Sequence, residues 1–119
     1  MMFQTLHSES ELDHIIESNQ LSFLYIAKNN CSVCHSLFPQ IEEIMEHYPT
    51  IVPGYVLIDE LPGIAGRFSI FSAPVLILFI EGKEYLREAR IVHLDQFQEK
   101  LDRLYQHFVL SYSHSRYEH

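Results

Sequence analysis

The alternation of short apolar runs with helix-periodic segments is the feature that most constrains the fold of this chain. Two short runs, Leu21–Ala27 and Val75–Ile80, are rich in aliphatic or aromatic residues, which is typical of strands buried on both faces of a sheet. Around these runs, apolar residues recur at intervals of three and four, which is typical of amphipathic helices. Strands that alternate with helices pair in parallel through crossover connections. The sequence therefore predicts an α/β domain.

The predicted elements alternate between strand and helix until a hairpin and a last helix close the chain. Besides the two apolar runs, the predicted strands are an edge strand at Phe3–Leu6, a strand at Ile51–Ile58 and a polar strand at Glu84–Val92, joined to Val75–Ile80 through Glu81-Gly82-Lys83. The first predicted helix begins at the Ser8 and Glu11 capping box and ends near Asn19. The other three predicted helices are Ser32–Tyr48, with a kink at Pro39, Glu60–Phe68 and Leu94–Phe108. The expected sheet is mixed, parallel in its first half and antiparallel in its C-terminal hairpin, with helices flanking it. We expect residues 1–110 to form one domain and residues 111–119 a frayed tail.

Composition and charge argue against several classes of function. The chain has 119 residues, with 16 Asp and Glu against 8 Lys and Arg, and the resulting net charge of -8 opposes binding to nucleic acid or anionic lipid. Its longest apolar run, Val75–Ile80, is far shorter than the roughly 18 residues that cross a bilayer. The N-terminus, Met1 to Ser10, lacks the basic and apolar stretches of a secretory signal. We therefore expect a cytoplasmic monomer that binds neither nucleic acid nor membranes.

The two cysteines carry the clearest chemical signal. Cys31-Ser32-Val33-Cys34 is a CxxC motif that follows a predicted buried strand and opens a predicted helix, a context that favours redox activity. Unpaired N–H groups and the helix dipole stabilise an anion at a helix N-terminus, so we expect a lowered pKa for the Cys31 thiol. Cys34 lies one turn later on the same face, close enough to displace a mixed disulfide. The sequence predicts that Cys31 attacks and Cys34 resolves.

Two other interpretations of the cysteine pair compete with this one. The cysteines could be unreactive core residues, which is common for this residue type. They could also bind zinc, but a structural zinc ion needs four ligands, and no second CxxC or His pair completes the set. His35 and His47 lie on the same predicted helix as Cys34, and His35 points away from it. We expect no metal and no cofactor.

The chain resembles the thioredoxin family from about Phe3 to Phe108. One landmark is the CxxC after a buried strand, and a second is Pro39, where thioredoxins kink the active-site helix. The third is Pro74, just before a hydrophobic strand, in the place of the family's cis-proline. The resemblance implies a thioredoxin fold and a cis peptide bond before Pro74.

The resemblance also implies a function and a set of site residues. A thioredoxin-like protein exchanges its CxxC dithiol or disulfide with protein substrates in cell redox homeostasis, and an upstream thiol reductase supplies its electrons. The backbone before the cis-proline, here that of Ala73, pairs with the substrate strand in this family. The substrate-binding residues that the resemblance implies are Ser32, Val33, Ala73, Pro74 and Arg90.

The chain departs from the family pattern at several positions. It contains no Trp, Ser32-Val33 replaces the usual Gly-Pro between the cysteines, and a family glycine falls at Arg90. The family's buried acid falls at Tyr25 and its Lys partner at Tyr55. A Tyr hydroxyl can donate to a thiolate but is a poor base, since its unperturbed pKa is about 10. We therefore expect slower resolution of mixed disulfides.

These departures motivate two rival hypotheses. One is a non-enzymatic binding module that presents the groove around Ala73, Pro74 and Arg90 to a partner. The other, less favoured, is a zinc-binding regulator.

Overall fold

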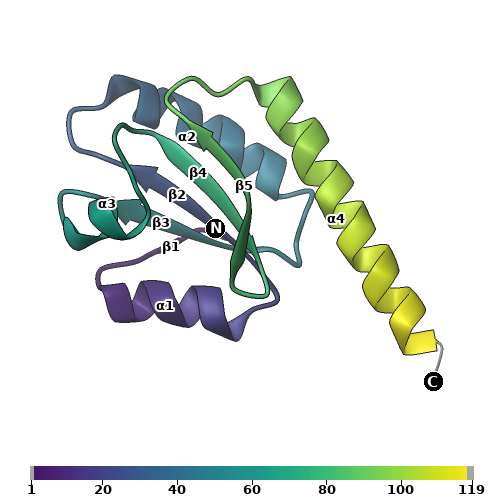
Figure 1. Cartoon of the computed structure of the whole chain (residues 1–119). Helices are drawn as coiled ribbons and strands as arrows, with labels where there is room; N and C mark the ends of the chain where they lie inside the picture. Colours follow the sequence, from purple (N-terminus) through teal and green to yellow (C-terminus); the bar gives the residue numbers. More distant parts are fainter. Residues whose placement is uncertain (1, 118–119) are drawn as a thin grey trace.

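The computed structural model describes the backbone of residues 2–117 and the side chains of residues 2–108. A five-stranded sheet lies at the centre, with helices on both faces (Figure 1). The strands are β1 (Gln4–Thr5), β2 (Leu21–Ala27), β3 (Val52–Leu57), β4 (Val75–Ile80) and β5 (Lys83–Ala89). The helices are α1 (Glu9–Ser18), α2 (Ser32–Met45), α3 (Gly63–Arg67) and α4 (Leu94–Tyr117). None of the helices in this part of the chain is long and apolar enough to cross a membrane.

The sheet is mixed, as the sequence predicts. Its strand order is β1-β3-β2-β4-β5. β3 pairs in parallel with both β1 and β2, whereas β4 runs antiparallel to β2 and to β5. The predicted parallel first half and C-terminal hairpin are both confirmed, and β2 lies at the centre between β3 and β4.

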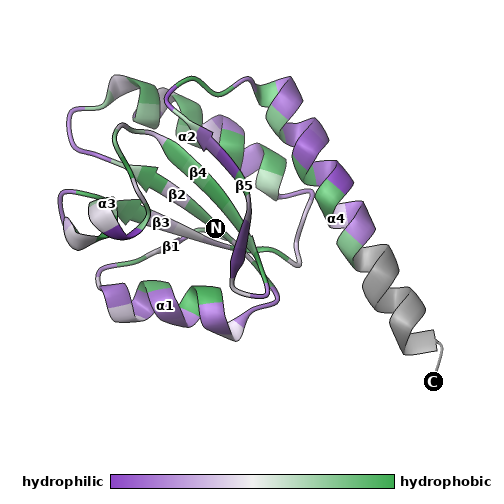
Figure 2. Cartoon of the chain, in the orientation of Figure 1, coloured by the Kyte–Doolittle hydropathy of each residue, from purple (hydrophilic) through white to green (hydrophobic). Residues whose placement is uncertain are grey.

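Side-chain alternation on the central strands divides the core into two layers. Phe23 and Tyr25 of β2 belong to the cluster that α2 and α4 cover, and Leu24 and Ile26 belong to the cluster that α1 and α3 cover. Figure 2 shows a contrast between two neighbouring strands: β4 is hydrophobic throughout, whereas β5, at the edge of the sheet, is largely hydrophilic. The prediction that the two apolar runs are fully buried strands is confirmed, since every residue of β2 and β4 is buried.

The start of α1 follows the predicted capping box. The Ser8 hydroxyl accepts a 3.1 Å hydrogen bond from the Glu11 backbone N–H, which satisfies one of the free amide donors of the first turn. The buried face of the helix consists of Leu12, Ile15 and Ile16. The helix ends at Ser18, with Asn19 as its C-cap, as expected.

Several elements differ in extent from the prediction. α2 ends at Met45 instead of Tyr48, and the polar strand spans Lys83–Ala89 instead of Glu84–Val92. Arg90 explains the second difference, because its φ of 65° is a left-handed conformation that cannot continue a strand. The predicted strands Phe3–Leu6 and Ile51–Ile58 each lose one residue at each end. α3 covers only five residues of the predicted Glu60–Phe68 helix.

The last helix extends beyond its predicted end at Phe108. α4 continues to Tyr117, so most of the segment expected to form a frayed tail is helical. The sequence between Leu94 and Tyr117 contains neither Gly nor Pro, the residues that most often end a helix. Residues 118–119 of the predicted tail lie outside the described residues.

Candidate functional site

The CxxC motif lies where the central strand β2 passes into helix α2. β2 ends at Ala27, and Asn30 turns the chain in a left-handed conformation (φ 60°) that Asn tolerates better than most residues. Asp59, just after β3, holds this turn because its Oδ1 accepts a 2.8 Å hydrogen bond from the Asn29 N–H. Cys31 is then the N-cap residue of α2. The turn therefore presents the first cysteine at the open end of a helix.

Cys31 and Cys34 are joined by a disulfide, with their Cα atoms 5.3 Å apart. Cys34 is buried (1% exposed), whereas Cys31 retains 9% exposure. The Cys34 backbone N–H donates a 3.2 Å hydrogen bond to Cys31 Sγ, and the first turn of α2 contains no acidic residue. This environment suits a sulfur anion at Cys31, since an amide donor and the positive end of the helix dipole both face it.

The loop before β4 lies at the same end of the sheet as the cysteines. Ile26 of β2 pairs with Val75 of β4, so the residues just before Val75 lie beside the end of β2. The peptide bond between Ala73 and Pro74 is cis, as the resemblance implies. Ala73 packs against the core cluster that contains both cysteines. The cysteine pair and the Ala73–Pro74 loop are thus brought together from positions about 40 residues apart in the chain.

Arg90 joins this group through its backbone. Val75 pairs with Ala89 of β5, and the Arg90 N–H donates a 2.9 Å hydrogen bond to the carbonyl oxygen of Pro74. The side chains of Ser32, Val33 and Arg90 are exposed, Ala73 is partly exposed, and Pro74 is buried. The structure therefore brings the five sequence-predicted substrate-binding residues together at one end of the sheet, where four of them have accessible surface.

Two exposed apolar residues at this end of the sheet were not predicted from the sequence. Phe71, in the loop that leads to Ala73, is 94% exposed, and Ile91, next to Arg90, is 73% exposed. Together with Val33, which is 52% exposed, they are three of the large hydrophobic side chains that the described residues leave in solvent. A signal for Phe71 exists in the sequence, since an aromatic residue between Ile70 and Ser72 lies outside any periodic apolar pattern.

Tyr25 lies on β2, at the position where the resemblance places the family's buried acid. The side chain is fully buried, and its hydroxyl donates a 2.7 Å hydrogen bond to the backbone carbonyl oxygen of Cys34, not to a sulfur. Its ring stacks on Tyr55 with 5.9 Å between centroids, and Phe38 packs edge-on against both rings. Burial raises the pKa of Tyr25, with a smaller contribution from Tyr55. The phenol therefore stays protonated and cannot serve as a base.

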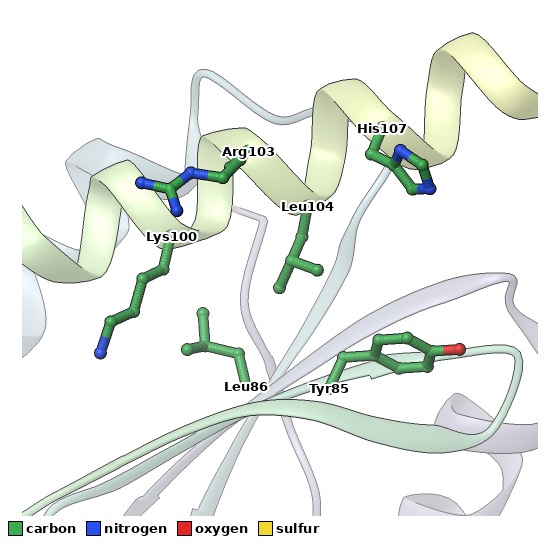
Figure 3. Close-up of a pocket in the computed structure, with 6 residues that line it drawn as sticks. All are labelled: Tyr85, Leu86, Lys100, Arg103, Leu104 and His107. Atoms are coloured by element: carbon green, nitrogen blue, oxygen red, sulfur yellow. The ribbon is translucent and has the colours of Figure 1, made fainter.

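Two cavities lie near or beyond the site. A cavity of about 240 Å³ adjoins the active-site helix and is lined by Phe3, Thr5, His35, Phe38, Pro39 and Tyr55. A larger one, of about 420 Å³, lies between β5 and α4 (Figure 3) and is lined by Tyr85, Leu86, Lys100, Arg103, Leu104 and His107. Neither cysteine lines the larger cavity, and two of its cations are already paired, Lys100 with Glu88 and Arg103 with Glu99. It is therefore separate from the CxxC site.

A metal centre finds no support in the part of the chain that the structure describes. No group of three or more His, Cys, Asp or Glu side chains there is arranged to hold a metal ion. Both cysteines are engaged in the disulfide.

A mixed sheet of this order, with a CxxC disulfide at a helix N-terminus beside a cis-proline, defines the class of thioredoxin-fold proteins. The family model described as Thioredoxin matches residues 4–107. The Thioredoxin-like protein YdfQ of Bacillus subtilis is 44% identical over 100 residues, which cover 84% of this chain and 89% of that protein. Thioredoxin-1 of Saccharomyces cerevisiae is 30% identical over 83 residues, which cover 70% of this chain and 81% of that protein. The chain belongs to the thioredoxin family.

Solved structures of thioredoxins share the fold. The crystal structure of oxidized thioredoxin O2 from Arabidopsis thaliana superposes with a TM-score of 0.78 at 24% identity, over 87% of this chain and 95% of that one. The solution structure of oxidised thioredoxin from Plasmodium falciparum gives a TM-score of 0.75 at 26% identity, over 83% of this chain and 97% of that one. Family membership together with the Cys31–Cys34 pair makes this chain, in general terms, a thiol–disulfide oxidoreductase.

Proposed function

We propose that this protein exchanges its dithiol with disulfides of protein substrates in cell redox homeostasis, with Cys31 as the attacking and Cys34 as the resolving cysteine. The observation that carries the proposal is the N-cap position of Cys31, where its sulfur accepts the Cys34 N–H and is disulfide-bonded to Cys34. Cys31 is also the more exposed of the two, so a substrate disulfide can approach it first.

The proposed exchange proceeds in two displacement steps. The Cys31 thiolate attacks a substrate disulfide, so a bond forms between Cys31 Sγ and one substrate sulfur while the other leaves as a thiolate and takes up a proton. Cys34, after losing its proton, attacks Cys31 Sγ and releases the second substrate thiol. The substrate gains two electrons and two protons, and the protein becomes the disulfide form seen in the structure. An upstream dithiol reductase returns it to the dithiol.

We propose that the exposed residues around the cysteine pair bind the substrate segment that carries the disulfide. Ser32 and Val33 flank the sulfurs, the backbone of Ala73 pairs with the segment, and Pro74 shapes the loop. Arg90 adds a cation beside Pro74, which favours acidic residues in the substrate. Phe71 and Ile91 extend the surface with apolar area, and their exposure of 94% and 73% supports this role.

The first test is insulin disulfide reduction with a thiol donor. We expect Cys31→Ser to abolish reduction, because no nucleophile remains at the helix N-terminus, whereas Cys34→Ser should accumulate mixed disulfides that mass spectrometry detects. The reduced wild-type protein should also show a reversible couple between roughly −120 and −270 mV. Full activity in either variant, or no reversible couple, would contradict the proposal and favour a binding module instead.

A second test separates docking from chemistry by using a protein and a small-molecule disulfide. We expect Phe71→Ser to raise KM for insulin by about threefold, because it removes apolar contact area, and to leave the rate with dithionitrobenzoate unchanged. Tyr85→Ser is the matched control, since Tyr85 is also exposed (55%) but lines the cavity between β5 and α4. Equal KM changes in both variants would refute a docking role for Phe71.

The same proposal takes the protein as a monomer working in the cytoplasm, where reductase systems keep thiols reduced. Size-exclusion chromatography of the reduced and oxidised forms tests the first point, and fractionation of the source cells tests the second.

A further inference from the structure

Tyr25 is a buried group near the cysteine pair to which the exchange chemistry assigns no task. It lies on the central strand β2 with no exposed surface, and its hydroxyl reaches across to α2 to donate its hydrogen bond to the Cys34 carbonyl oxygen. That carbonyl is in the first turn of α2, and the next carbonyl along the helix, that of His35, loses its helical donor because Pro39 has no N–H. The Tyr25 hydroxyl thus ties the first turn of α2 to the central strand through a side-chain hydrogen bond.

The neighbours of Tyr25 keep its hydroxyl in place. The ring stacks on Tyr55 of β3 at an interplanar angle of 11°, and Phe38 of α2 lies edge-on at 5.1 Å. Leu76 of β4 faces Tyr25 in the register of the sheet and is also fully buried. A large ring packed on three sides cannot change its rotamer without disturbing this cluster, so the position of the hydroxyl is well defined.

We propose that Tyr25 is a positioning residue for the resolving cysteine. Its hydrogen bond holds the first turn of α2 so that Cys34 Sγ stays within reach of Cys31 Sγ while Cys31 is bonded to a substrate. In the oxidised protein the disulfide itself joins the two residues, but in the mixed disulfide that bond is open, and the hydrogen bonds of the first turn of α2, that from Tyr25 included, keep Cys34 in line. Intramolecular attack depends strongly on such alignment. This inference rests on the proposed function and adds a residue to it.

Tyr25 acts here by position and not by proton transfer. Its hydroxyl proton is already donated to the Cys34 carbonyl, and burial keeps the phenol protonated. Tyr55 on β3 stacks on its ring, and His35 and Tyr55 both line the adjoining cavity. Tyr25 therefore does not take up the proton that Cys34 loses before it attacks.

The test uses the reduced full-length protein and dithionitrobenzoate in a stopped-flow instrument. The first release of nitrothiobenzoate reports attack by Cys31, and the second reports resolution by Cys34, so the two steps are measured separately. We expect Tyr25→Phe to slow the second phase by about threefold or more and to leave the first phase within about twofold of wild type. Tyr55→Phe, which removes the hydroxyl of the stacked ring, should leave both phases within about twofold.

Two results would contradict a positioning role for Tyr25. A second phase in Tyr25→Phe within about twofold of wild type overturns it, and so does equal slowing of both phases, which would indicate general loosening of α2. If circular dichroism shows that Tyr25→Phe does not fold, Tyr25→Met provides the same loss of the hydroxyl with a more adaptable side chain. A wild-type protein that releases only one equivalent would refute the proposed function itself, whatever the Tyr25 variants do.

Discussion

Arg90 contributes both an unusual backbone conformation and a positive charge to the site. Its φ of 65° is a conformation that suits glycine, yet the side chain points into solvent and the N–H bonds to Pro74. The chain carries a net charge of -8, so Arg90 has a charge opposite in sign to that of the chain as a whole. The sequence alignment locates Arg90 at a family glycine, but only the backbone shows that β5 ends there.

His7 allows a prediction about pH at the same scale. The pKa of His7 is raised by its hydrogen bond to Glu60, 2.6 Å away, and by the charge of that carboxylate. A raised pKa in the folded state means that the contribution to stability is complete below the unfolded value of about 6.5 and is lost as the pH rises through the folded value. We expect the urea midpoint of His7→Gln to lie below that of wild type at about pH 5.5, and the two to coincide at about pH 8.5.

The expected shift in midpoint is small because both partners are largely exposed to solvent. Added salt should reduce it further, since exposed charges are screened. A difference between His7→Gln and wild type that is the same at both pH values would show that the ring acts by packing and not by its charge.

At the scale of elements, β3 shows where packing overrides local propensity. Pro53 and Gly54 are both poor strand residues, yet both lie inside β3, where Pro53 pairs with Phe23 of β2. Gly54 pairs with Gln4 of β1 and Leu24 of β2. Its missing side chain leaves the room that Leu6 occupies in the core next to it.

Substituting two glycines by Ala tests this interpretation. A Cβ atom at Gly54 would lie 2.7 Å from Leu6 Cδ1 and 3.3 Å from Leu24 Cδ2, and both leucines are fully buried and cannot swing away. We expect Gly54→Ala to lower the free energy of unfolding by about 1–3 kcal/mol in urea denaturation.

The matched control is Gly66 of α3, where a Cβ atom would meet nothing within 4 Å. Because Ala is the better helix former, Gly66→Ala should raise the free energy of unfolding by up to about 1 kcal/mol. If both substitutions changed stability in the same direction, the close approach of Leu6 and Leu24 would not explain why a glycine stands at position 54.

At the scale of the whole molecule, the two faces of the sheet are covered by different helices and form separate core clusters. α1 and α3 pack on one face and cover the cluster that contains Leu24 and Ile26. α2 and α4 pack on the other face, whose cluster includes both cysteines. The site therefore lies at the edge of the larger core layer, where the end of β2, the start of β4 and the first turn of α2 meet (Figure 1). A rigid central sheet is what keeps these three segments in register.

The sequence alone accounts for the elements and for the reactive pair, because both depend on local patterns. Apolar runs and helical periods are read over a few residues, and Cys31 and Cys34 lie within a single helical turn. Element ends were less well predicted, since they depend on backbone conformations such as that of Arg90.

The tertiary structure decided the long-range contacts of the site. The sequence left the hydrogen-bond partner of the Tyr25 hydroxyl open, and the fold supplies the backbone carbonyl oxygen of Cys34. The exposure of Phe71 and Ile91 likewise follows from which neighbours the fold brings to that edge. Contacts between residues distant in the chain depend on the packing of all the elements at once, and no local pattern encodes them.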